Sequence, residues 1–356
     1  MELKRTFHAV GQGAFYTERF YEGNKNVFNV VYDCGSETSK KKKKSIDNAI
    51  ERFCKDHKDH VEADNTSKPK IDLVFVSHFH DDHVNGMSML LEKCDVEKLV
   101  IPFMSLESII EVYIYNIIAS NNVNNAANRF LVYCFWGSND RVTKIPSREG
   151  EALVYSSGDV IKPNGLSGLE NLWEYIPICI TDNRKSSFIL GFQANYKDLY
   201  DAFKNNDYYF VNAFFSSTIE IERMRGFYKG YFKDLNESSM AVLSKPATDL
   251  GQRNALCLYT GDYPMRSKRS GKKLIDYYRV YWNETGTIQV PHHGASNDNP
   301  LYLYEGVERE CVMCYGKGNR YRHPGKTTIY NIKHSGSILK EVTQDFQTEY
   351  KQLFAF

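Results

Sequence analysis

The sequence predicts an α/β fold whose strands end in turns rich in histidine and aspartate. The chain has 356 residues, 42% of them hydrophobic and 25% charged, so it is long enough to bury a large core. Apolar runs of strand length alternate with helical stretches, as in folds that combine sheets and helices. Polar turns follow several of these runs, and the clearest example is the segment 77–83 directly after the apolar run 71–76.

Residues 1–102 are predicted to alternate strands with helices. Runs rich in valine, isoleucine, phenylalanine and tyrosine indicate the strands, and a glycine-flanked turn at 11–13 separates the first two. The five lysines at 40–44 indicate a solvated loop. In order, the predicted elements are strands at 7–10, 14–16 and 26–32, a helix at 45–57, a strand at 71–76, a helix at 86–94 and a strand at 98–102.

The rest of the chain combines further strands with a polar and aromatic stretch at 181–235. We expect this stretch to be an insertion that covers or extends the functional site. The other expected elements are a helix at 105–120, strands at 131–136 and 152–155, a hairpin from 158–161 to 173–178, a helix at 196–204, and strands at 239–243, 256–260, 287–290 and 310–315. No internal repeat and no linker divides the sequence.

Composition and charge limit the classes of partner. The formal net charge of +1 gives no overall field that would attract nucleic acid, so such binding would need a local basic patch. The first residues lack the apolar core of a signal peptide, and no apolar run approaches the roughly 20 residues of a membrane span. The sequence therefore predicts a cytoplasmic protein without membrane contact.

The eight cysteines are expected to be free thiols in a reducing compartment. Cys311 and Cys314 have the spacing of a zinc knuckle, but they lie in a strand-like run with no second pair. Residues three apart on a strand point to opposite faces of the sheet. Both are therefore predicted to be buried thiols.

The segment 77–83 holds four potential metal ligands within six residues, namely His78, His80, Asp82 and His83. Neutral imidazole and ionised carboxylate suit a borderline divalent ion such as zinc. His78 and His80 are two apart, so in an extended segment they point to the same side. Asp82 and His83 follow where the chain turns. A single histidine is usually a surface or core residue, but that interpretation fits all four together poorly.

Two later turns offer further ligands. Asp262 follows the apolar run 255–258, and His292 and His293 follow the run 287–290. Taken singly, each is explained equally well by an ordinary turn. Because each set follows a strand, one end of a sheet would bring them together with the first motif.

This set of motifs resembles the metallo-β-lactamase superfamily, whose metal motif is His-x-His-x-Asp-His. More narrowly, the chain resembles the branch that contains the soluble hydrolase domain of the bacterial DNA-uptake protein ComEC. The motifs of that branch are matched in order by Ala9-Val10-Gly11-Gln12-Gly13 (with Ala in place of Asp), Asp33-Cys34-Gly35, Asn236-Glu237-Ser238-Ser239, Thr260-Gly261-Asp262, His292-His293-Gly294-Ala295 and residues 316–324.

The resemblance implies one metallo-β-lactamase-like domain over residues 1–356, a four-layer αββα sandwich with insertions near 103–150 and 181–235. It also implies two divalent ions, zinc or manganese. The implied ligands are His78 and His80 for the first ion, Asp82, His83 and His293 for the second, and Asp262 as the bridge. Which of His292 and His293 contacts metal stays open. No histidine lies between His83 and His292, where the superfamily supplies a further ligand, so the first ion would have about three protein ligands.

The resemblance implies hydrolysis by a water shared between the two ions, which lower the pKa of that water towards neutrality. The implied catalytic residues are Asp82, which orients the water and takes its proton, His292, which faces the substrate, and His323, which contacts the substrate or donates to the leaving group. Three cations at 317–322 suit phosphate better than a neutral lactone or lactam. The predicted substrate-binding residues of this segment are Lys317, Asn319, Arg320 and Arg322.

The first hypothesis is therefore a metal-dependent phosphodiesterase or nuclease that acts on nucleic acid or on a nucleotide-derived phosphodiester. A second enzyme class stays open, the hydrolysis of a carboxyl ester, thioester or lactone, because the same metal pair can perform it. In a hypothesis of another kind, the metal-stabilised fold is a binding module in a larger bacterial assembly, and the insertions are surfaces for protein partners. A solvated loop is the alternative for residues 317–322.

Overall fold

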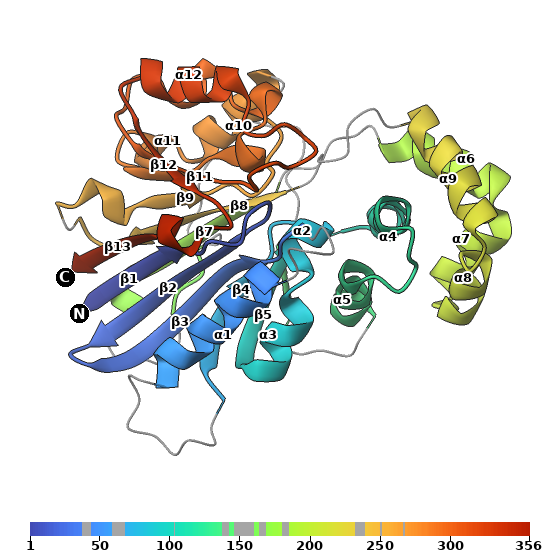
Figure 1. Cartoon of the computed structure of the whole chain (residues 1–356), viewed down its shortest axis with the longest axis horizontal. Helices are drawn as coiled ribbons and strands as arrows, with labels where there is room; N and C mark the ends of the chain where they lie inside the picture. The colour runs from blue at the N-terminus through green and yellow to red at the C-terminus, as the bar shows by residue number, and fades with distance from the viewer. Residues whose placement is uncertain are drawn as a thin grey trace.

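The computed structural model describes residues 1–37, 44–58, 68–102, 104–136, 142–145, 160–163, 169–179, 185–231, 239–249, 251–265 and 268–356. Two β-sheets lie against each other at the centre, and helices cover the outer face of each (Figure 1). The predicted α/β fold class is therefore confirmed, together with its four layers in the order helices, sheet, sheet, helices.

The first sheet has the strand order β13-β1-β2-β3-β4-β5-β6. Strands β13, β1, β2 and β3 pair antiparallel, whereas β3 to β6 pair parallel. The carboxyl ends of β3, β4 and β5 therefore meet at one edge of this sheet. The bounds are Glu2–Phe7 (β1), Phe15–Glu22 (β2), Lys25–Cys34 (β3), Lys70–Phe75 (β4), Asp95–Pro102 (β5), Val142–Ile145 (β6) and Tyr350–Ala355 (β13).

The second sheet has the strand order β12-β11-β10-β9-β8-β7. Strands β9 to β12 pair parallel, and β7, β8 and β9 pair antiparallel. The short strands β9 and β10 each lead directly into one of the predicted ligand turns. The bounds are Trp173–Cys179 (β7), Met240–Pro246 (β8), Cys257–Tyr259 (β9), Thr287–Gln289 (β10), Glu310–Cys314 (β11) and Ile338–Val342 (β12).

Three hydrophobic clusters fill the spaces between the layers. The central cluster joins Phe7 and Tyr16 of the first sheet to Tyr175 and Tyr259 of the second. The other two clusters pack helices against the outer face of each sheet, so both faces of each sheet bury apolar surface. The helices are Lys44–Lys58 (α1), Asp81–Val84 (α2) and Met87–Lys93 (α3) beside the first sheet, and Lys268–Tyr277 (α10), Arg279–Trp282 (α11) and Lys326–His334 (α12) beside the second.

The two segments predicted to be insertions supply most of the remaining helices. In Figure 1, α6 to α9 lie at the right of the view, beyond α4 and α5. Phe188, Phe203 and Tyr228 of these helices pack into the cluster on the outer face of the first sheet, so they extend that core. The bounds are Leu106–Ser120 (α4), Ala126–Phe135 (α5), Lys185–Asn195 (α6), Lys197–Lys204 (α7), Tyr208–Phe214 (α8) and Thr218–Tyr231 (α9). None of the described helices is long and apolar enough to cross a membrane.

Several predicted elements have the right type, and one is wrong. Helices α1, α3, α4 and α7 coincide with predicted helices. The predicted strand at 131–136 is wrong, because these residues belong to α5. The side chain of Asn125 caps this helix by accepting a hydrogen bond from the backbone nitrogen of Asn128 at 2.7 Å. The cap lies upstream of the apolar run 131–136. The run by itself has the composition of a strand, so it does not show the helix that the cap starts.

Other predicted elements differ in extent. The first two strands are longer than predicted and shifted, because residues 8–14 form a loop between β1 and β2. The predicted hairpin reduces, within the described residues, to an antiparallel bridge between Ile161 and Tyr175. The predicted strand at 152–155 and Lys40 to Lys43 of the predicted loop lie outside the described residues.

All eight cysteines are thiols outside disulfide bonds, as predicted. Cys311 and Cys314 are buried on β11. Cys311 packs in the outer cluster of the second sheet, whereas Cys314 packs between the sheets. Their side chains therefore point to opposite faces, and they are not paired ligands of one ion.

A buried carboxylate joins the two sheets. Glu18 of β2 is 1% exposed and accepts a hydrogen bond from Nε of Arg5 at 2.7 Å. From the second sheet, the hydroxyls of Tyr175, Ser244 and Tyr259 donate to the same carboxylate at 2.8–2.9 Å. A buried charge is tolerated only where it is paired and hydrogen-bonded. The network therefore fixes how the two sheets meet.

Candidate metal centre

Loops at one end of the first sheet carry the first set of predicted ligands. The chain leaves β4 at Phe75, and His78 and His80 lie in the segment that leads to α2. Asp82 and His83 lie within α2 itself. The extended segment and the short helix thus place four ligand side chains along one short stretch of backbone.

The second sheet contributes the remaining ligands from the turns after β9 and β10. Gly261, which precedes Asp262, has a φ of +53°, and a Cβ there would lie 2.6 Å from both the Ser77 Cβ and the Ser239 Oγ. Only glycine allows the two loops to approach so closely. In this way the turn after β9 is held against the segment that carries His78.

The turn after β10 is strained. His292 and His293 have φ values of 48° and 51°, in the left-handed region that residues with a side chain rarely adopt. Such a conformation costs about 1–3 kcal/mol for each residue and persists only where the surroundings enforce it. Here the Asn299 amide donates to the carbonyl oxygens of Pro291 and Ala295 on both sides of the turn. These hydrogen bonds hold the strained turn in place, and with it both imidazoles.

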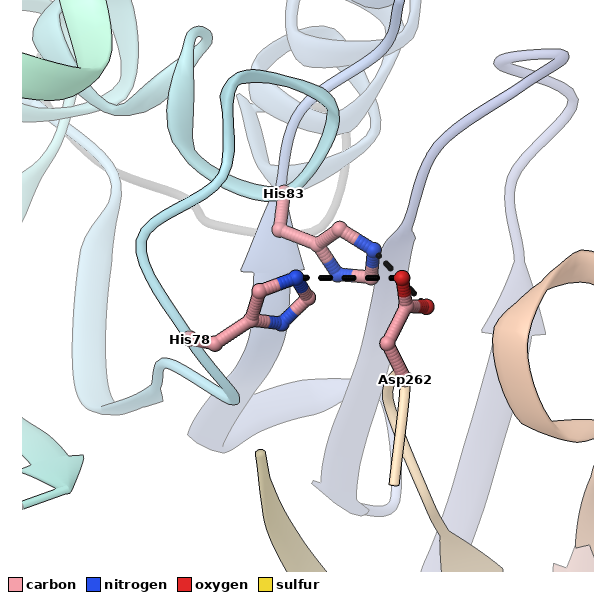
Figure 2. A group of neighbouring side chains, drawn as sticks. All are labelled: His78, His83 and Asp262. Atoms are coloured by element: carbon pink, nitrogen blue, oxygen red, sulfur yellow. Dashed lines mark ion pairs between the residues drawn. The ribbon is translucent and has the colours of Figure 1, made fainter. Parts of the chain in front are cut away.

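The first group of ligands consists of His78, His83 and Asp262 (Figure 2). All three are buried, and their ligand atoms lie within 4.8 Å of one another. Nε2 of His83 is 3.2 Å from Oδ1 of Asp262, and Nε2 of His78 is 3.8 Å from Oδ2. Neither Nε2 atom has a hydrogen-bond partner among the described residues. Two buried ring nitrogens thus face one carboxylate.

The second group consists of Asp82, His83 and His293, so His83 belongs to both groups. Nε2 of His293 is 3.1 Å from Oδ2 of Asp82 and 3.8 Å from Oδ1 of Asp262. Nδ1 of His293 donates to the carbonyl oxygen of Cys314 at 3.0 Å. This bond leaves the lone pair of the neutral ring on Nε2, the atom that faces the carboxylates.

Asp33 and Ser77 orient two of the histidines from behind. Nδ1 of His83 lies 2.8 Å from Oδ2 of Asp33, and the hydroxyl of Ser77 donates to the same oxygen at 2.7 Å. The Ser77 oxygen is 2.9 Å from Nδ1 of His78 and can accept its proton. Both rings therefore present Nε2 to the site, the arrangement that supports metal-bound histidines in proteins.

The electrostatics of the site favour a cation. Burial by itself lowers the pKa of His83, but nearby carboxylates, Asp262 foremost, outweigh burial and raise that pKa well above its ordinary value. Burial likewise raises the pKa of Asp262, but nearby histidines, His292 foremost, hold it well below its ordinary value. The raised pKa favours a proton on His83, whose positive charge offsets the negative charge of the carboxylates. A bound divalent ion would offset the same negative charge.

The donor set fits a divalent ion. Buried imidazole nitrogens converge with carboxylate oxygens, and neither group contains a cysteine. Zinc and manganese both accept such a nitrogen and oxygen set. Nε2 of His83 can bind only one ion, but Asp262 faces both groups and has two carboxylate oxygens, so the residues together could hold two neighbouring ions.

His80 belongs to neither of these groups. Its ring centroid lies 4.5 Å from that of His78 and 4.4 Å from that of Tyr115 on α4. Burial lowers the pKa of His80 to about 4, so the ring is neutral at physiological pH. The structure thus places a neutral imidazole beside the first group of candidate ligands, with Tyr115 of α4 against it.

His292 and His323 lie on the opposite flank, beside the ligands from the second sheet. Nδ1 of His292 lies 2.7 Å from Oδ2 of Asp298, and its Nε2 lies 3.7 Å from Oδ2 of Asp262. The ring of His323 is 5.3 Å from that of His292. Burial, followed by the charges of neighbouring histidines, lowers the pKa of His323 to about 4. The amide nitrogen of Gln12, which can only donate, is 3.4 Å from Nδ1 of His323, so the proton of the neutral ring lies on Nε2.

The predicted substrate-binding residues lie on the loop that carries His323. The Asn319 amide donates to the carbonyl oxygen of His323 and accepts from its backbone nitrogen, so this side chain shapes the loop. A nitrogen of Arg320 lies 2.9 Å from a carboxylate oxygen of Glu37. Lys317 and Arg322 are exposed on the same loop.

Three residues that support the site, Asp33, Ser77 and Asp298, were not assigned to it from the sequence. In the sequence, Asp33 belongs to the glycine-containing motif Asp33-Cys34-Gly35 after a strand. That motif is the signal that marks Asp33 as a residue near the site. Asp298 is six residues from His292, but aspartate is common in turns, so spacing alone does not mark it.

Replacing Asp33 with asparagine should lower metal affinity about 10- to 100-fold, because a partner behind a metal-bound histidine typically contributes that much. The amide keeps the shape of the carboxylate but removes its negative charge. Competition with a chromophoric chelator measures the affinity, and circular dichroism checks the fold. Asp56→Asn on α1, whose half-exposed carboxylate pairs with Lys4, is the control and should bind metal normally. Unchanged affinity in Asp33→Asn would remove Asp33 from the site.

Comparison with known proteins supports the metal-binding interpretation over part of the chain. Residues 25–103, which include the segment from His78 to His83, match the family model described as the metallo-beta-lactamase superfamily. Among solved structures, a long form RNase Z from yeast is similar at 7% identity and a TM-score of 0.34, over 87% of this chain and 36% of that chain. No curated protein matches the sequence. Residues 25–103 are therefore similar to part of the metallo-beta-lactamase superfamily, the superfamily that the metal motif of this chain resembles.

Proposed function

We propose that this protein is a metal-dependent phosphodiesterase or nuclease of the ComEC-like branch. The observation that carries the proposal is the pair of adjoining ligand groups that share His83 and face Asp262. The residues that would hold two divalent ions, zinc or manganese, are His78, His80, Asp82, His83, Asp262 and His293. Bound there, the ions would acidify a shared water and polarise an oxygen of the substrate.

Asp82 is the residue best placed to handle the proton of the attacking water. Its side chain is 20% exposed, whereas that of Asp262 is 3% exposed. One side of the Asp82 carboxylate therefore reaches the open face of the site while the other contacts His293. From this position it would orient a water and accept its proton.

His292 and His323 are placed to act on the substrate. The bond from Nδ1 of His292 to Asp298 fixes that ring, which is 17% exposed, beside Asp262. The contact with Gln12 leaves the Nε2 proton of His323 available as a donor. In this proposal, that proton stabilises the leaving oxygen as it acquires negative charge.

The charge of the loop 317–322 favours a phosphate over a neutral carboxyl substrate. Lys317, Arg320 and Arg322 are all exposed on this loop, which also carries His323. Arg320 is paired with Glu37 through one of its nitrogens, and its guanidinium has further donors. Arginine and lysine recognise phosphate oxygens through charge-assisted hydrogen bonds. The loop would therefore supply the local positive charge that the net charge of the chain does not.

The glycine motifs support the assignment to the ComEC-like branch. A Cβ on Gly13 would lie 2.4 Å from the carbonyl oxygen of Gly35, and one on Gly35 would lie 2.5 Å from the carbonyl carbon of His83. Neither position accepts a side chain unless the backbone moves. The backbone of both motifs thus packs closely against the segment that carries Asp82 and His83. This close packing is a physical reason for glycine at both positions.

A substrate panel tests the proposed function. Protein loaded with zinc or manganese is incubated with DNA, RNA, a cyclic dinucleotide and a bis-aryl phosphate, and in parallel with a carboxyl ester, a thioester and a lactone. We expect hydrolysis of phosphodiesters and none by the Asp82→Ala, His83→Ala double variant. Turnover of the carboxyl substrates alone would favour the second enzyme class. Turnover that survives the double substitution would exclude the metal mechanism, and no turnover at all would favour a binding module.

A further inference from the structure

An exposed tyrosine lies beside the candidate metal centre. The ring of Tyr321 is stacked on that of His323, with centroids 5.6 Å apart and an angle of 27° between the ring planes. His323 in turn lies 5.3 Å from His292 and 6.5 Å from His293. Yet 45% of Tyr321 is exposed to solvent. A large aromatic surface is thus open to solvent two rings away from the ligands.

This ring is held by its stacking on His323 and, in addition, by contacts of its hydroxyl group. Arg320 donates to the Tyr321 hydroxyl at 2.7 Å, and the hydroxyl donates to Glu37 at 3.4 Å. The Arg320 guanidinium also lies 4.9 Å from the centre of the Tyr321 ring, and it pairs with Glu37. Holding an exposed aromatic ring in one place reduces the side-chain entropy that is lost when a ligand stacks on it. We call Arg320 and Tyr321 the stacking platform.

A second aromatic ring lies on the other flank of the ligands. Tyr115 of α4 is half-buried, and its ring is 4.4 Å from that of His80. Burial raises the pKa of Tyr115, and the nearby charge of Asp82 raises it further. One tyrosine of α4 and one tyrosine of the loop 317–322 therefore lie beside histidines of the candidate centre.

We propose that the stacking platform binds a nucleobase next to the phosphate that the candidate metal centre holds. The proposal rests on the proposed function and specifies its substrate class as nucleotide-containing phosphodiesters. Bases stack on tyrosine rings and on guanidinium planes regardless of sequence. The basic side chains of the same loop would contact the adjoining phosphates. A phosphodiester without a base would lose the platform contact and keep the others.

Binding of a nucleotide and of the sugar phosphate that lacks its base tests this proposal without any need for turnover. Calorimetry compares 2′-deoxyadenosine 5′-monophosphate with 2-deoxyribose 5-phosphate on the full chain loaded with zinc or manganese. We expect the base to raise affinity about 5- to 100-fold in the unsubstituted protein. Tyr321→Ala should remove this advantage and leave the affinity for the sugar phosphate within about twofold. Tyr321→Phe, which keeps the ring, should retain most of it.

Tyr330 provides a matched control. It is 61% exposed on α12 and is stacked on His334, with ring centroids 5.2 Å apart. Tyr330→Ala should therefore leave both affinities unchanged. Equal binding of the two ligands by the unsubstituted protein, binding of neither, or a base preference that survives Tyr321→Ala would each overturn the proposal. A base preference that depends on Tyr321 in a protein that hydrolyses no phosphodiester would instead overturn the proposed function alone.

Discussion

Replacing Asp262 with asparagine is expected to lower phosphodiester turnover about a thousandfold or more, the largest effect on activity that we expect of a single substitution. The carboxylate of Asp262 faces a ring nitrogen of each of four histidines at 3.2–3.8 Å, namely His78, His83, His292 and His293. The amide keeps the shape of the side chain but removes the charge that would bridge two ions. Several kcal/mol of transition-state stabilisation depend on the bound metal, and each 1.4 kcal/mol or so changes the rate tenfold.

Steady-state kinetics on the best substrate of the panel measure this effect. Asp198→Asn is the control, because Asp198 is exposed in the first turn of α7. It should leave turnover unchanged. A fall of less than about tenfold in Asp262→Asn, in a protein with an unaltered thermal transition, would show that Asp262 does not bridge metal ions.

Replacing Glu18 with alanine is expected to cost about 3–5 kcal/mol of unfolding free energy, the largest effect on stability. The substitution leaves the buried guanidinium of Arg5 without its carboxylate and leaves the hydroxyls of Tyr175 and Tyr259 without their acceptor. Each loss carries a desolvation cost that folding no longer offsets. Because the network joins the two sheets, the substitution weakens the contact between them.

Denaturant unfolding followed by circular dichroism measures the change in stability. Glu22→Ala is the matched control, because Glu22 lies at the exposed end of the same strand. It should change the unfolding free energy by less than about 0.5 kcal/mol. A change of similar size in Glu18→Ala would show that the buried network is not needed to hold the sheets together.

The first metal motif was predictable because its chemistry is local. Three imidazoles and one carboxylate within six residues form a pattern that surface turns rarely produce. Asp262 and the His292–His293 pair were predictable only through the fold. Each follows a strand, and the structure brings the corresponding strand ends together.

The residues behind the ligands could not be found in this way. Asp33 is 50 positions from His83, and no spacing rule states which of the many acidic residues will face a given ring nitrogen. The hydrogen bond to Asp33 depends on β3 and β4 lying side by side in parallel, which is a tertiary property. Asp33 therefore emerged from the structure.

The helices of the two segments predicted to be insertions were only partly predictable for a similar reason. The apolar run at 131–136 has the composition of a strand, and its helical state depends on the Asn125 cap and on packing against neighbouring helices. Helix α9 packs beside α4, far from it in the sequence. Tertiary contacts of this kind override local preference.

The most direct measurement is the metal content of the purified protein. The chain is dialysed first against zinc or manganese and then against metal-free buffer, and elemental analysis gives the number of ions per chain. A dinuclear centre built on the two groups that share His83 predicts about two ions per chain, and a clear loss of bound metal in Asp262→Asn. A well-folded chain that retains no metal after this treatment, or the same metal content in Asp262→Asn, would contradict the assignment of these residues as a metal centre.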